Sequence, residues 1–112
     1  MFRVKICGVT EVVDAQALAA AGADAIGLNF YPPSVRCISL AQAAAIVQAI
    51  PATVHRVGVF VNASSEEISH YLDELLLDFV QLHGDESPEF AAALKIARPN
   101  IRLIRAVRCG VD

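Results

Sequence analysis

The sequence lacks the features that mark several classes of protein. Its 112 residues include no tryptophan and one methionine, and only 19% of them are charged. No apolar run approaches the roughly 18 consecutive residues that a membrane-spanning helix needs, and the N-terminus has no long apolar core of the kind found in signal peptides. We therefore expect a soluble, cytoplasmic chain that does not contact a membrane.

Charge and cysteine are also sparse, and their pattern excludes two more classes. Nine Lys and Arg against twelve Asp and Glu give a net charge of −3, and no basic stripe with interleaved aromatic residues argues for a nucleic-acid partner. Cys7, Cys37 and Cys109 are far apart in the sequence. None has the Cys-x-x-Cys or Cys/His spacing of a zinc site, so we expect reduced thiols and no metal.

What the chain does contain is a regular alternation of two hydrophobic patterns. Short runs rich in β-formers predict strands, and the stretches between them carry helix start signals. The expected strands are 3–7, 24–30, 54–61, 78–83 and 101–107, and the expected helices are 11–21, 40–50, 65–76 and 88–97. The expected helix caps are Thr10, Ser39, Ser64 and Ser87.

This alternation predicts an α/β fold with a parallel sheet and right-handed crossovers. The repeat is about 25 residues, so eight units would approach the size of a (β/α)8 barrel. Five strands fit a doubly wound sheet equally well. The pattern alone leaves both architectures open.

Polar residues cluster directly after the predicted strands. Ligands bind at the carboxyl ends of parallel strands, and Cys7 ends the first of them. Period-two alternation places Lys5 and Cys7 on one face of that strand, and Gln81 and His83 on one face of the fourth. A thiol in this position can act as a nucleophile or base, whereas a buried thiol would be a small apolar group. Cys7 is therefore the first candidate for chemistry.

Four motifs, in this order, resemble the phosphoribosylanthranilate isomerase family. They are Lys-Ile-Cys-Gly at 5–8, Gly-Leu-Asn-Phe-Tyr-Pro-Pro-Ser at 27–34 followed by Arg36, Val-Gly-Val-Phe-Val-Asn at 57–62, and Val-Gln-Leu-His-Gly-Asp-Glu at 80–86. The resemblance implies a parallel (β/α)8 TIM barrel that acts in tryptophan biosynthesis. The implied reaction is the Amadori (aldose–ketose) isomerisation of N-(5-phosphoribosyl)anthranilate, a small phosphorylated substrate, to 1-(2-carboxyphenylamino)-1-deoxyribulose 5-phosphate. It implies no metal or organic cofactor, because the imine of the substrate is itself the electron sink.

The same resemblance implies roles for four residues, and position alone adds a fifth. Cys7 matches the general base that takes the C2′ proton of the ring-opened Schiff base. Arg36 would hold the anthranilate carboxylate with its planar guanidinium. Gln81 and His83 would line the pocket near the substrate, and Asn29 is a further substrate-binding candidate by position.

Some of these residues also have plainer interpretations. Lys5 is either a cation that favours the Cys7 thiolate or a core-facing lysine paired with an Asp or Glu inside the barrel. Arg36 could be a solvated loop arginine, and His83 could cap the turn that follows at Gly84.

The resemblance also implies parts that this chain does not contain. The family's general acid is an aspartate at the end of the sixth strand, and its phosphate loops follow strands seven and eight. We therefore expect residues 1–112 to be the N-terminal portion of a single (β/α)8 barrel domain, truncated to about four and a half βα units.

Open strand edges would favour self-association or a complementary C-terminal half-barrel. The alternative function is a non-catalytic half-barrel or assembly module. An indole-glycerol-phosphate synthase fits less well, because that family lacks the Lys-Ile-Cys-Gly start.

Overall fold

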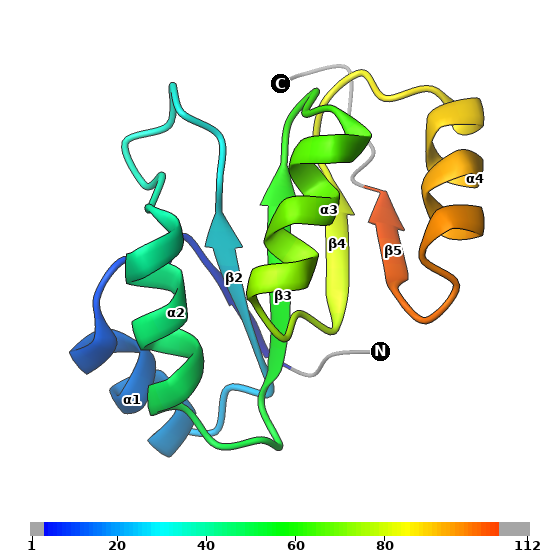
Figure 1. Ribbon diagram of the computed structural model, residues 1–112. Coiled ribbons are helices and arrows are strands. Elements are labelled where there is room, and N and C mark those ends of the chain that lie inside the picture. The colour runs from blue at the N-terminus through cyan, green and yellow to red at the C-terminus, as the bar shows by residue number, and fades with distance from the viewer. Residues whose placement is uncertain (1–3, 106–112) are drawn as a thin grey trace.

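The computed structural model describes residues 4–105 as alternating strands and helices (Figure 1). The elements are β1 (Lys5–Cys7), α1 (Val12–Ala20), β2 (Ala25–Asn29), α2 (Leu40–Ala49), β3 (His55–Phe60), α3 (Ser65–Glu74), β4 (Phe79–Leu82), α4 (Pro88–Ala97) and β5 (Arg102–Arg105). The predicted alternation is confirmed. The predicted end of the last strand at 107, and Cys109, lie outside the described residues.

Strand order decides between the two architectures that the sequence left open. All four neighbouring pairs are parallel, and the order in the sheet is β1-β2-β3-β4-β5. The helices lie along one face of this curved sheet (Figure 1). A doubly wound sheet reverses its strand order once and carries helices on both faces. The described sheet therefore has the progression of a barrel, and β1 and β5 form its two edges.

Two apolar layers hold the sheet in this shape. On the outer face, every helix contributes at least one buried side chain to the main core. These side chains include Ala15, Ala43, Ile46, Ile68 and Leu94, and they share a cluster with Ile26, Leu28, Val80 and Leu82 of the strands. The inner face has a smaller cluster of Ala25, Val57 and Phe79, against which Ile104 packs. The alternation along each strand thus separates an outer core from an interior floor.

A group of aromatic rings joins β2, β3 and α3 on the outer side. The Phe30 ring stacks on Tyr71 with centroids 4.2 Å apart, and the Phe60 ring lies 5.3 Å from Phe30. Burial, and then the charges of Cys37 and Glu67, raise the pKa of the Tyr71 hydroxyl above its usual 10.0. Tyr71 therefore remains neutral at physiological pH and serves as a packing residue at the base of the β2–α2 loop.

Three of the four predicted helix caps are confirmed. The hydroxyls of Ser39, Ser64 and Ser87 each accept a backbone N–H from the first turn of their helix. The prediction for Thr10 is wrong, because α1 begins one residue later and Glu11 occupies its N-cap without a side-chain cap bond. None of the helices between residues 4 and 105 has the length and apolar character to cross a membrane.

The cap at Ser39 is a full capping box, and its removal is expected to destabilise the chain. Its Oγ accepts the Gln42 N–H at 3.1 Å, and Gln42 Oε1 accepts the Ser39 N–H at 2.9 Å. We expect Ser39→Ala to lower the free energy of unfolding by about 1 kcal/mol in urea titrations. The control is Ser65→Ala, one residue inside α3, with an expected effect below about 0.5 kcal/mol. Equal effects of the two substitutions would contradict this account.

Candidate functional site

A cavity of about 410 Å³ opens where the first four strands end. It is formed by the last residues of these strands and by the loops that follow them. The lining residues are Cys7, Gly8, Asn29, Tyr31, Ser34, Val59, Val61, Gln81 and His83. The structure thus brings together four of the five predicted site residues, from segments far apart in the sequence. The carboxyl edge of a parallel sheet is where such folds bind ligands.

Cys7 has room in this cavity because its neighbour in the sheet is a glycine. Cys7 pairs with Gly27, and a Cβ at Gly27 would lie 2.9 Å from the Cys7 Sγ. The backbone also turns sharply after the thiol, since Gly8 has a φ of 77° and donates its N–H to the Gly27 carbonyl at 3.2 Å. Cys7 is exposed. The interpretation of Cys7 as a buried apolar thiol is therefore wrong.

Arg36 lies at the rim of the cavity, above Gly8. A Cβ at Gly8 would collide with the Arg36 Cδ, so the aliphatic part of the arginine occupies the space that a side chain there would need. The Ser34 hydroxyl fixes the loop by accepting the Arg36 N–H at 3.1 Å. Arg36 as a whole is exposed, and its guanidinium nitrogens lie beside Gly8, the residue that follows β1.

Asn29 shapes the loop that carries Arg36. Its Oδ1 accepts the Tyr31 N–H at 2.8 Å, and its Nδ2 donates to the Ser34 hydroxyl at 3.4 Å. Both ends of the amide are therefore engaged within the loop, as expected for an asparagine that begins a turn. A direct contact between Asn29 and a substrate stays a prediction.

Lys5 contacts an amide on a strand that is not its neighbour. Its Nζ donates to Oε1 of Gln81, so the contact crosses the interior from β1 to β4. Within residues 4–105, the partner of Lys5 is thus an amide and not the Asp or Glu of one interpretation, because glutamine occupies the facing inward position of β4. Gln81 is buried, and its Nε2 lies 3.5 Å from the His83 Nδ1. An electrostatic effect of Lys5 on Cys7 stays a prediction.

A buried carboxylate ties the loops after β3 and β4 together. The Glu86 side chain accepts the Asn62 N–H at 2.7 Å and the Gly84 N–H at 2.8 Å, and Glu86 is only 7% exposed. Asn62 has a φ of 52°, and its side-chain Oδ1 accepts the Asp85 N–H at 2.9 Å. A Cβ at Gly84 would lie 2.7 Å from the Asn62 Oδ1. We name Asn62, Gly84, Asp85 and Glu86 the loop clamp.

The loop clamp changes two interpretations of the sequence. Glu86, and not His83, accepts the Gly84 N–H, so His83 does not cap that turn. Glu86 is the last residue of the motif at 80–86, and the sequence pattern predicts no role for it. The one signal available was a carboxylate two residues after a glycine in a predicted loop, and this spacing is common in turns that have no such role.

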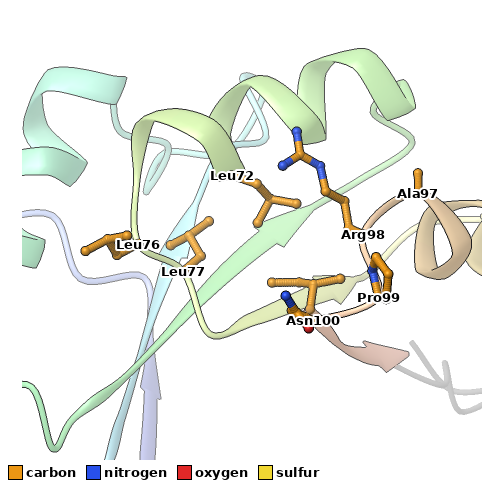
Figure 2. Close-up of a pocket in the computed structure, with 8 residues that line it drawn as sticks. Leu72, Leu76, Leu77, Ala97, Arg98, Pro99 and Asn100 are labelled. Carbon is orange, nitrogen blue, oxygen red and sulfur yellow. The ribbon is translucent and has the colours of Figure 1, made fainter.

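A second hollow, of about 540 Å³, is larger but has no comparable chemistry (Figure 2). The aliphatic side chains of Leu72, Leu76 and Leu77 face the turn between α4 and β5 across it. Its one charged lining residue, Arg98, is paired with Asp73 at 2.7 Å. The hollow lies at the amino ends of β4 and β5, opposite the edge that carries Cys7. Across residues 4–105, no group of three or more His, Cys, Asp or Glu could hold a metal ion.

Comparisons with known proteins show which family the chain resembles in sequence and fold. The family model for N-(5'phosphoribosyl)anthranilate (PRA) isomerase matches residues 4–110. The chain belongs to this family. The N-(5'-phosphoribosyl)anthranilate isomerase of Azotobacter vinelandii is 54% identical over 110 residues, which are 98% of this chain and 52% of the relative. That of Acinetobacter calcoaceticus is 59% identical over 87 residues, which are 78% of this chain and 41% of the relative.

A solved structure of a phosphoribosylanthranilate isomerase shares the fold. It superposes with a TM-score of 0.86 at 44% identity and covers 96% of this chain and 54% of its own. That protein was crystallised with reduced 1-(o-carboxyphenylamino)-1-deoxyribulose 5-phosphate. The five-stranded sheet and its helices are thus a partial (β/α)8 barrel, as the resemblance implied. The chain spans about half the length of the relatives that it matches.

Proposed function

We propose that residues 1–112 form the N-terminal portion of a single (β/α)8 barrel domain that isomerises N-(5-phosphoribosyl)anthranilate in tryptophan biosynthesis. The product is 1-(2-carboxyphenylamino)-1-deoxyribulose 5-phosphate. The observation that carries the proposal is the cavity at the strand ends, where Cys7, Gln81 and His83 meet in a chain of the isomerase family. The similar structure that binds a reduced form of this product supports a small phosphorylated ligand.

Cys7 is the proposed general base of the reaction. After ring opening, the substrate is a Schiff base whose C2′ proton is acidic because the imine accepts the electron pair. The thiolate of Cys7 takes this proton, the electrons move into the imine, and an enolamine results that tautomerises to the ketone. An exposed thiol at the end of β1 has the access that this step requires.

The other predicted residues bind and orient the substrate. Arg36 presents a guanidinium at the rim, and its planar fork suits the anthranilate carboxylate. Gln81 and His83 line the wall formed by β4, and Asn29 lines the wall formed by β2. The general acid for ring opening and the loops that hold the phosphate belong to the complementary half of the barrel.

Growth complementation tests the proposal. The chain is expressed in a strain that lacks the isomerase, either alone or with the part of the Azotobacter vinelandii relative beyond the matched 110 residues. We call the second combination the hybrid barrel. We expect growth without tryptophan only from the hybrid barrel, because each half lacks residues that the other supplies.

The two halves of the Azotobacter relative, expressed together, are the matched control. If they restore growth and the hybrid barrel does not, the proposed function is wrong, and the chain is better described as a non-catalytic assembly module. Growth with the chain alone would show that the general acid does not have to come from a second half.

A further inference from the structure

One interior contact has a chemical consequence beyond packing. Lys5 and Gln81 meet below the cavity although they belong to β1 and β4, and Gln81 continues the contact to His83. These three residues form a line from the interior to the cavity wall. In the first link, the lysine can only donate, whereas the Gln81 amide can present either its oxygen or its NH2 group. In the second link, the His83 ring can carry its proton on either nitrogen.

The first link fixes the orientation of the Gln81 amide. A lysine ammonium carries three donors and no acceptor. Only the Oε1 of Gln81 can therefore face the Lys5 Nζ, and the Nε2 group must face the other way. Because Gln81 is only 8% exposed, water competes little for either end of its amide.

The second link fixes the protonation of the His83 ring. The Gln81 Nε2 is a donor and lies 3.5 Å from the His83 Nδ1. A donor is satisfied there only if Nδ1 is an acceptor, which in a neutral imidazole places the proton on Nε2. The Nε2–H, on the other nitrogen of the ring, is then the hydrogen-bond donor that His83 retains, and His83 lines the cavity.

We infer that Lys5 is a positioning residue that acts through Gln81 to hold His83 as a neutral Nε2–H donor for an oxygen atom of the substrate. The inference rests on the proposed function for the identity of that ligand. A carboxylate, hydroxyl or keto oxygen is an acceptor of the required kind. A His83 held in this form cannot accept a proton at Nε2, so it does not compete with Cys7 as the base.

The ¹⁵N chemical shifts of the imidazole nitrogens test the tautomer directly, because a protonated and an unprotonated ring nitrogen have well-separated shifts. The labelled chain is measured at about pH 8, where an ordinary imidazole is neutral. The sequence has three histidines, and His55→Gln and His70→Gln assign the His83 signals. We expect Nε2 protonated and Nδ1 unprotonated. A wild-type spectrum with a protonated Nδ1 overturns the inference.

Two substitutions are expected to reverse the tautomer. In Gln81→Glu, the carboxylate can only accept, so Nδ1 becomes protonated. In Lys5→Glu, the new carboxylate can only accept, so the NH2 group of Gln81 turns towards it. The Gln81 oxygen then faces the His83 Nδ1, which becomes protonated. The second substitution is the sharper test, because its effect must pass through Gln81. If the Lys5→Glu chain does not fold, Lys5→Met is used, and the Nε2–H form is expected to decrease towards the mixture of a free imidazole.

Lys95→Met is the matched control, because the Lys95 Nζ donates to the Pro99 carbonyl at 2.8 Å, remote from the cavity. The role of Lys5 is overturned if the His83 ¹⁵N shifts stay unchanged in the Lys5 variant. It is also overturned if Lys95→Met moves these shifts as much as the Lys5 variant does.

Reduced 1-(o-carboxyphenylamino)-1-deoxyribulose 5-phosphate, added to the hybrid barrel, tests the ligand. It is expected to shift the Nε2 signal, and binding without that shift overturns the donor role. A hybrid barrel that does not bind the compound overturns the proposed function and the ligand assignment together, whereas the tautomer is judged from the chain alone.

Discussion

Cys7→Ala in the hybrid barrel is expected to lower kcat by about 100- to 10,000-fold, the range typical for loss of a positioned general base. The physical reason is that no other side chain then takes the C2′ proton, while the cavity walls that bind the substrate remain. KM is therefore expected to change little. The measurement is steady-state conversion of N-(5-phosphoribosyl)anthranilate by the purified hybrid barrel.

A second free thiol in the described part of the chain provides the control. Cys37 lies in the β2–α2 loop, is half-buried, and directs its Sγ towards the Ile38 carbonyl at 3.9 Å. It is not among the residues that line the cavity. We expect Cys37→Ala to retain wild-type kcat, and a cysteine-directed alkylating reagent to inactivate that variant as fast as the parent. An active Cys7→Ala enzyme would remove Cys7 from the mechanism.

Glu86→Ala is expected to lower the free energy of unfolding by about 2–3 kcal/mol, because two N–H groups lose a charged acceptor in a buried site. These are the N–H groups of Asn62 and Gly84, bonded to Glu86 at 2.7 and 2.8 Å. Glu86→Gln is expected to be almost as harmful. Its amide keeps one acceptor oxygen but turns an NH2 group towards the second N–H, so a donor faces a donor. Urea titration of the chain measures both effects.

An exposed glutamate distinguishes the loop clamp from a general effect of charge. Glu74 ends α3 and is exposed, so Glu74→Gln is expected to change stability by less than about 0.5 kcal/mol. If Glu86→Gln were equally mild, the two clamp bonds would contribute little. In the hybrid barrel, we also expect Glu86→Gln to raise KM, because the loop clamp fixes the segment directly after His83.

Much of this site follows from local pattern. Three serine caps, the strand ends and the shared faces of Lys5 with Cys7 and of Gln81 with His83 could be predicted, because helix caps and period-two alternation depend on residues near in sequence. The error at Thr10 has the same origin. A cap signal is a few residues long, and a start one residue later satisfies the same pattern.

The contacts within the site could not be predicted in this way. One of the two interpretations of Lys5 pairs its ammonium with a carboxylate, because a buried charge most often has a charged partner. The structure gives it the amide of Gln81, since that side chain occupies the facing inward position of β4. The role of Glu86 depends likewise on tertiary structure, because its carboxylate accepts N–H groups from the loop after β3 and from the loop after β4. The spacing of its motif does not predict these two hydrogen bonds.

Local periodicity and local hydrogen bonds are enough to predict the alternation of strands and helices, the three serine caps and the inward-facing polar residues. The strand order β1-β2-β3-β4-β5 and the single helical face depend instead on contacts between segments that are far apart in the sequence. The side of the sheet on which each crossover packs is a non-local choice, and the same local pattern serves a barrel and a doubly wound sheet. That choice brings Cys7 beside the ends of the other strands and so creates the cavity.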